Sequence, residues 1–179
     1  MKLIRLLIAD DHPVVRDGLS GMFAAEPGFE VLGEAADGAE AVRLARALNP
    51  DVILMDLRMP GMDGLAAITE LSRRKISARV LVLTTYDTDS YVLPAIEAGA
   101  TGYLLKDAPR DELLRAVRAA ADGHGVLAPS VATRLMSRVR AAVRQRGHGQ
   151  DPPAAHLRQT GDSDPMARTP PACVPQPPP

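Results

Sequence analysis

Short apolar runs alternate with longer amphipathic stretches through the first 122 residues of the chain. The runs are four to seven residues long, rich in Val, Ile and Leu, and mostly continuous rather than alternating with polar residues. Continuous apolar runs are typical of parallel β-strands that are covered on both faces. We therefore predict five such strands, at 3–9, 29–35, 52–55, 80–84 and 102–105.

The stretches between these runs carry apolar residues at helical spacing. In one of them four apolar residues lie at i, i+4, i+7 and i+8, on one face of a helix: Val15, Leu19, Met22 and Phe23. The next two stretches begin after Asp37 and Asp63, which are suitable N-cap residues. Strand–helix repeats of this kind, five in about 120 residues, predict a doubly wound α/β fold with helices on both faces of a parallel sheet.

Polar residues follow the predicted strands where each one ends. They are two adjacent acids, a third acid, a hydroxyl and an amine: Asp10, Asp11, Asp56, Thr84 and Lys106. In open α/β sheets the ligand site lies beyond the carboxyl ends of the strands, so these groups are expected to converge at one edge. Each residue alone also has an ordinary structural explanation, since strand-end Asp residues often cap helices.

Two carboxylates about 4 Å apart repel each other by about 4 kcal/mol at an effective dielectric constant near 20. An acid cluster therefore needs compensating positive charge. Ligands that are all oxygen favour Mg²⁺, and Lys106 would add an ammonium group. A divalent cation and an ammonium together suit phosphoryl oxygens, with Thr84 as a hydroxyl donor. We therefore predict that Asp56 is a nucleophile for a phosphoryl group.

Composition narrows the class of protein further. The chain has 179 residues with a net charge of −1, and no apolar run approaches the roughly 20 residues of a membrane span. The lone Cys173 excludes an internal disulfide, and we expect a cytoplasmic protein with no membrane partner.

Charge is unevenly distributed along the chain: residues 1–122 carry 19 acids and 14 bases, whereas residues 123–150 carry five Arg and no acid. We predict three regions: a domain over 1–122, a basic helical linker over 123–146 and a Pro-rich disordered tail over 147–179.

Four segments resemble the signature segments of response-regulator receiver domains, in order and with the family's spacing: IADDHPVVRDGL, DVILMDLRMPGMDG, VLVLTTYD and GATGYLLKD. The resemblance extends from residue 3 to about 140 and is strongest for the NarL/FixJ-type branch. It implies a CheY-like (flavodoxin-like) five-stranded sheet of order 2-1-3-4-5. It also implies a phosphoacceptor role for Asp56, a phosphoryl contact for Lys106, and a switch pair of Thr84 and Tyr103.

The same resemblance implies a Mg²⁺ site. Asp11 and Asp56 would bind the cation directly, the Arg58 backbone carbonyl would be the third protein ligand, and Asp10 would bind mostly through water. His12 is expected to help begin the first helix rather than act as a catalytic base. Pro94 departs from the family pattern, because a proline inside the fourth helical stretch removes a backbone hydrogen bond and predicts a looser helix.

The resemblance implies a phosphoryl donor, a sensor histidine kinase, and a homodimer on phosphorylation. Transcriptional control is the family's usual output, but the helix-turn-helix domain that would bind DNA is not recognisable here, so we expect a regulator that lacks it. A single-domain receiver or a phosphoryl sink acting through protein contacts is the alternative. A Mg²⁺-dependent phosphatase-like hydrolase is a weaker alternative, because "ADDHP" lacks the D-x-D spacing of haloacid-dehalogenase-type enzymes. The main interpretation is a phosphoacceptor and not a turnover enzyme.

Overall fold

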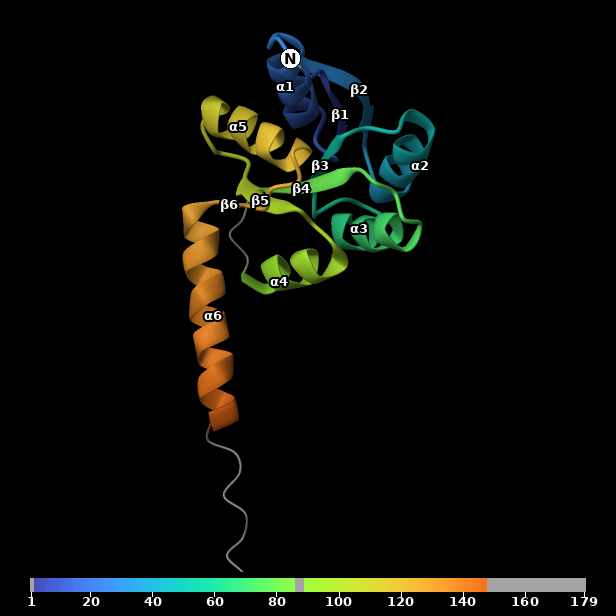
Figure 1. Ribbon diagram of the computed structural model, residues 1–179. Coiled ribbons are helices and arrows are strands. Elements are labelled where there is room, and N and C mark those ends of the chain that lie inside the picture. Colours follow the sequence, from blue (N-terminus) through green and yellow to red (C-terminus); the bar gives the residue numbers. More distant parts are fainter. Residues whose placement is uncertain (1, 86–88, 148–179) are drawn as a thin grey trace, which may run out of the picture.

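A computed structural model describes residues 2–85 and 89–147 of the chain, which fold around one parallel β-sheet (Figure 1). The sheet has six strands in the order β2-β1-β3-β4-β5-β6. The strands are β1 (Ile4–Ala9), β2 (Phe29–Ala35), β3 (Val52–Asp56), β4 (Arg79–Thr84), β5 (Gly102–Leu105) and β6 (Val126–Leu127). Every neighbouring pair is parallel, so all the strands point their carboxyl ends to the same edge.

Helices cover both faces of the sheet, with α1 and α5 on one face and α2, α3 and α4 on the other (Figure 1). The six helices of the described residues are α1 (Pro13–Ala24), α2 (Gly38–Leu48), α3 (Gly64–Arg73), α4 (Asp89–Ala98), α5 (Arg110–Ala121) and α6 (Pro129–Gly147). The side chains of Asp37 and Asp63 cap α2 and α3 by accepting hydrogen bonds from the Glu40 and Ala66 amides. Both predicted N-caps are therefore confirmed.

The core lies where the continuous apolar runs predicted it. All five residues of β3 are buried, and five of the six in β1 are buried as well. Side chains from strands and helices close the interior, among them Phe23 of α1 and Ile68 of α3, which are 0% and 1% exposed. Apolar side chains on both faces of a strand are the mark of a sheet covered by helices on both sides.

The doubly wound fold, its five predicted strands and their order 2-1-3-4-5 are confirmed. A sixth strand, β6, was not predicted because it has only two residues, too few for an apolar pattern. It pairs with β5 through Gly102, where a Cβ atom would lie 2.6 Å from the Val126 carbonyl oxygen. The absence of a side chain at Gly102 lets the two backbones approach.

Helix α4 contains Pro94 at an interior position, as the sequence predicted. Because proline has no N–H, it cannot donate the hydrogen bond that the Ser90 carbonyl would otherwise accept. The helix nevertheless continues to Ala98, and Val92 and Ala95 on either side of the proline are buried. Packing of this apolar face therefore holds α4 helical through the proline.

Helix α6 leaves the body of the domain and extends well beyond the sheet (Figure 1). Within the segment predicted as a basic helical linker, 123–146, α6 begins at Pro129, after the short strand β6. Its first turns contact α4 and bury Val131, whereas Met136, Val139 and Val143 are exposed. The predicted tail after Gly147 lies outside the described residues, and the division of the chain into three regions stays a prediction.

Candidate functional site

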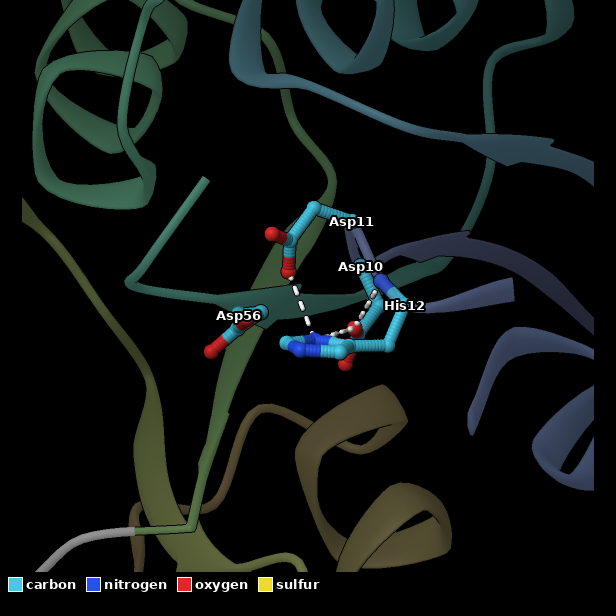
Figure 2. A group of neighbouring side chains, drawn as sticks. All are labelled: Asp10, Asp11, His12 and Asp56. Atoms are coloured by element: carbon cyan, nitrogen blue, oxygen red, sulfur yellow. Dashed lines mark hydrogen bonds and ion pairs between the residues drawn. The ribbon is translucent and has the colours of Figure 1, made fainter. Parts of the chain in front are cut away.

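Three carboxylates meet at the carboxyl edge of the sheet (Figure 2). Asp10 and Asp11 directly follow β1, and Asp56 is the last residue of the neighbouring strand β3. One ligand atom from each of these acids, together with one from His12, lies within 4.8 Å of the others. The predicted convergence of Asp10, Asp11 and Asp56 is therefore confirmed, although they come from separate strands.

Lys106 supplies the positive charge of the cluster. Its ammonium nitrogen contacts Asp10 Oδ2 and lies 3.2 Å from Asp56 Oδ2, so one cation bridges two acids. The Lys106 backbone N–H donates to the Thr84 carbonyl at 2.8 Å, which fixes the residue just past the end of β5. The three side chains are nearly buried, at 9% exposure for Lys106, 2% for Asp10 and 5% for Asp56. Lys106 therefore lies where the sequence predicted it.

Burial raises the pKa of the Asp56 carboxyl above its ordinary value. The Lys106 charge lowers that pKa, the Asp10 charge raises it, and hydrogen bonds from the Arg58 backbone and Lys106 lower it. The net direction is upward, so the ionised carboxylate is less favourable here than in water. More positive charge beside Asp56 would stabilise the carboxylate, which is what a bound cation supplies.

The backbone after Asp56 turns sharply into α3. The Gly64 N–H donates to the Leu57 carbonyl at 3.0 Å, which closes the loop that contains Pro60 and Gly61. A Cβ atom on Gly64 would lie 2.7 Å from the Leu57 Cα and closer still to the Asp56 carbonyl oxygen. Only glycine fits there without moving the chain that carries Asp56.

Thr84 and Tyr103 are both buried. Thr84 ends β4, is 3% exposed, and pairs with Leu105 across the sheet. Tyr103 lies on β5 opposite Val82 and is 0% exposed, so its ring is inside the protein. The side chain is therefore enclosed by the protein rather than lying at its surface.

The contacts that His12 and Arg16 make with the acid cluster were not predicted from the sequence. His12 occupies the N-cap position of α1, as expected, but its side chain makes no capping hydrogen bond. Its imidazole instead turns toward the acids, with Nδ1 2.8 Å from Asp11 Oδ1 and 3.4 Å from Asp10 Oδ1 (Figure 2). Arg16, one helical turn later, donates to the Asp10 carbonyl at 2.6 Å. The sequence signal that could have pointed to Arg16 is its position four residues after His12, one helical turn further along the chain.

The donor set fits a divalent cation. Asp11 Oδ1 is buried and accepts no hydrogen bond, although His12 Nδ1 lies 2.8 Å away. A buried carboxylate oxygen with no donor is unfavourable unless a cation or water takes that place. The neighbouring acids supply more oxygen ligands of the kind that Mg²⁺ prefers. The Arg58 carbonyl is the one predicted ligand that belongs to the backbone.

Comparison with known proteins points to the same family as the sequence motifs do. The family model described as the response regulator receiver domain matches residues 6–118. The chain is 49% identical over 138 residues to the transcriptional regulatory protein LiaR of Bacillus subtilis, covering 77% of this chain and 65% of LiaR. It is 45% identical over 134 residues to the nitrate/nitrite response regulator protein NarP of Escherichia coli, covering 75% of this chain and 62% of NarP.

Solved structures are similar as well. A two-component response regulator of the LuxR family from Aurantimonas sp. SI85-9A1 matches with a TM-score of 0.73 and 35% identity, over 78% of this chain and 99% of that one. The response regulator ChrA of a heme-sensing two-component system matches with a TM-score of 0.66 and 44% identity, over 78% of this chain and 67% of that one.

The chain spans somewhat less than two thirds of the length of the relatives LiaR and NarP. Within the described residues, no helix combines the length and apolar character needed to cross a membrane. The similarity lies in the α/β domain that carries the acid cluster. The chain therefore belongs to the response regulator receiver domain family of two-component systems, with regulators of the NarL and LiaR type among its relatives.

Proposed function

We propose that Asp56 accepts a phosphoryl group from the phosphohistidine of a sensor histidine kinase. The observation that carries this proposal is the contact of Lys106 with both Asp10 and Asp56 at the carboxyl edge of the sheet. A buried carboxylate beside an ammonium group and two further acids can attack phosphorus and hold the product. Membership of the receiver family supports the same role.

In the transfer, an Asp56 carboxylate oxygen forms a bond to phosphorus while the phosphorus–nitrogen bond to the donor histidine breaks. The electron pair of that bond goes to the leaving imidazole nitrogen. Lys106 lowers the pKa of Asp56, which favours its ionised form, and then lies within reach of the phosphoryl oxygens that gather beside it. Burial of Asp56 keeps bulk water away from the acyl phosphate that forms.

We assign the Mg²⁺ ligands to Asp11, Asp56 and the Arg58 backbone carbonyl, with Asp10 bound through water. When bound, the cation neutralises the carboxylates and binds phosphoryl oxygens. Asp10 has both carboxylate oxygens engaged, Oδ1 by the His12 N–H at 2.9 Å and Oδ2 by Lys106, which supports its assignment as the outer acid. Asp11 Oδ1 accepts no hydrogen bond, which supports its assignment as a direct ligand.

Thr84 and Tyr103 form the switch pair in this proposal. New acceptor oxygens on Asp56 attract the Thr84 hydroxyl, and Tyr103 fills the space behind it. The buried ring of Tyr103 corresponds to this inward arrangement. Phosphorylation would therefore bias an equilibrium in which Tyr103 is already able to occupy the interior.

For the whole protein we propose regulation of transcription through a phosphorylation-dependent homodimer. The relatives LiaR and NarP, described as a transcriptional regulatory protein and a response regulator, support this output. Protein contacts alone, as in a single-domain receiver or a phosphoryl sink, are the alternative. Binding of the chain to operator-like DNA, measured with and without phosphorylation, tests these outputs: tight, sequence-specific binding would favour transcriptional control by this chain itself and would contradict the expectation that the helix-turn-helix domain is missing.

The decisive experiment is incubation with acetyl phosphate and Mg²⁺, followed by intact-mass analysis. The wild type is expected to gain one phosphoryl group, and Asp56→Asn none. Asp51→Asn is a matched control, because Asp51 precedes the same strand and its carboxylate accepts from the Arg5 amide instead. Labelling that persists in Asp56→Asn would contradict the assignment, and multiple turnover of small phosphate esters would favour a hydrolase.

A further inference from the structure

We propose that the imidazole of His12 contributes a nitrogen ligand to the divalent cation at this site. The site would then favour Mn²⁺ and later first-row transition metals over Mg²⁺ more strongly than carboxylates alone do. This inference rests on the proposed function only in placing a cation among the same acids.

The position of the ring carries the argument. His12 Nδ1 lies 2.8 Å from Asp11 Oδ1 and 3.4 Å from Asp10 Oδ1, and Figure 2 shows the ring reaching across the acid cluster. Two adjacent ligands of an octahedral ion with bonds near 2.1 Å lie about 3.0 Å apart. The two separations lie on either side of this value, so a cation bound by Asp11 Oδ1 would lie within reach of Nδ1.

The alternative roles for His12 are weaker. A capping role is absent, since the side chain makes no capping hydrogen bond at the start of α1. A simple hydrogen bond to Asp11 also fails, because Asp11 Oδ1 has no hydrogen-bond donor although Nδ1 is close. Nδ1 and Asp11 Oδ1 form an ion pair only when the imidazole is protonated; with a neutral ring, the two atoms lie at the separation of two ligands of one ion.

Charge and access also allow this role. Lys106 contacts the Oδ2 atoms of Asp10 and Asp56, whereas His12 lies by the Oδ1 atoms of Asp10 and Asp11, so the two side chains lie by different oxygens. The His12 side chain is 67% exposed, so its ring can turn at little cost. Deprotonated imidazole nitrogen is the form that binds metals.

The consequence is a change in metal preference. Carboxylate and water ligands suit Mg²⁺ and Mn²⁺, whereas imidazole suits Ni²⁺, Zn²⁺ and other later metals. A fourth side chain with a nitrogen donor therefore adds little to Mg²⁺ affinity and much to Ni²⁺ affinity. In a cell the site would respond to which of these ions is available as well as to the kinase.

The test uses the full chain without an affinity tag, as wild type, His12→Asn and His124→Asn. His124 is an exposed histidine between α5 and β6 and serves as the matched control. Calorimetric titrations with Mg²⁺, Mn²⁺ and Ni²⁺ give the affinities, and electron spin-echo envelope modulation of the Mn²⁺-loaded protein detects coupling to imidazole nitrogen. His12→Gln is a second variant should Asn disturb the start of α1.

We expect His12→Asn to lower Ni²⁺ affinity by about tenfold or more, to change Mg²⁺ affinity little, and to abolish the imidazole modulation. His124→Asn should leave all three unchanged. Modulation that survives in His12→Asn and His12→Gln, or an equal loss of Mg²⁺ and Ni²⁺ affinity, would overturn the inference. Asp56 labelling by acetyl phosphate with Mg²⁺ is scored separately, so failure of the phosphoacceptor assignment leaves the metal result readable, and the reverse holds too.

Discussion

Lys106 Nζ lies 3.2 Å from Asp56 Oδ2 although the two residues end different strands with β4 between them. The side chain must cross the edge of β4 to make this contact, and it touches Asp10 of a further strand as well. The end of the sheet thus works as one electrostatic unit in which a single ammonium compensates two buried acids. Changes to any of the three should alter the behaviour of the others.

Asp56→Asn should stabilise the domain at neutral pH without a cation. A carboxyl whose pKa rises on folding favours the folded state while it is protonated. This stabilising contribution is fully present below the pKa of the carboxyl in the unfolded chain, ordinarily 3.8. It is lost as the pH rises through the pKa of the carboxyl in the folded protein. At pH 7 the buried carboxylate therefore opposes folding, and its removal should raise the free energy of unfolding by about 1–2 kcal/mol, a usual size for one substitution.

Urea unfolding of wild type and Asp56→Asn at pH 7 and near pH 3 checks this, with the difference expected to shrink at the lower pH. Mg²⁺ at 100 times its Kd should stabilise the wild type by about 2.7 kcal/mol and the variant much less. An Asn variant less stable than wild type at pH 7 would show that the ion pair with Lys106 outweighs desolvation.

Lys106→Met should make Asp56 harder to ionise. Loss of the ammonium removes the largest influence that lowers the Asp56 pKa, so that pKa should rise further. The rate of phosphorylation by acetyl phosphate should fall by roughly tenfold to a hundredfold, and its acid limb should move to higher pH. Intact-mass time courses over a pH series measure both. Lys106→Arg keeps the charge and should keep the pH limb near that of the wild type, whereas an identical shift in both variants would contradict an electrostatic role.

Much of this site follows from the sequence, because parallel strands carry their ends to a shared edge. Once continuous apolar runs indicated parallel strands, Asp10, Asp11, Asp56 and Lys106 had to lie near one another. The spacing of residues along the chain, however, says nothing of side-chain rotamers. The contact of Lys106 with two acids and the turn of His12 toward the cluster depend on rotamers chosen by the folded surroundings, so neither could be predicted.

Elements too short to show a hydrophobic periodicity were also not predicted. Strand β6 has two residues and forms by pairing with β5. The two strands are far apart in the sequence, so no local pattern of residues predicts this pairing. Burial of Tyr103 likewise depends on the packing around β5 rather than on its own neighbours in sequence.

Gly64→Ala should be severely destabilising, whereas Gly21→Ala should not. A Cβ at Gly64 would lie 2.7 Å from the Leu57 Cα, so the loop that carries Asp56 would have to move. Gly21 lies inside α1 with no atom within 4 Å of its Cβ position, and Ala there should stabilise the helix by about 0.5–1 kcal/mol. Urea unfolding should therefore show opposite signs, with a loss of about 2–4 kcal/mol for Gly64→Ala. Equal effects of the two substitutions on the free energy of unfolding would show that the loop at Gly64 moves at little energetic cost.

Pro94→Ala should slow hydrogen exchange in α4. The substitution restores a backbone N–H that can donate to the Ser90 carbonyl, and an interior helical proline costs about 3 kcal/mol relative to alanine. Mass-spectrometric hydrogen exchange should show more protection in α4 and unchanged protection in α3. Equal protection in variant and wild type would show that the packing of Val92 and Ala95 already determines the stability of α4.

Val131→Ala and Val139→Ala distinguish the attached part of α6 from the part that extends away. Val131 is fully buried against the domain, whereas Val139, eight residues and about two helical turns further along the same stripe, is 47% exposed. Removing two methyl groups from a buried site should cost about 1–3 kcal/mol, and the exposed substitution should stay within about 0.5 kcal/mol. Thermal or urea unfolding of the two variants measures the difference. If Val131→Ala had no effect, the contact of α6 with α4 would contribute nothing to folding, and the helix would have to be treated as independent of the receiver domain.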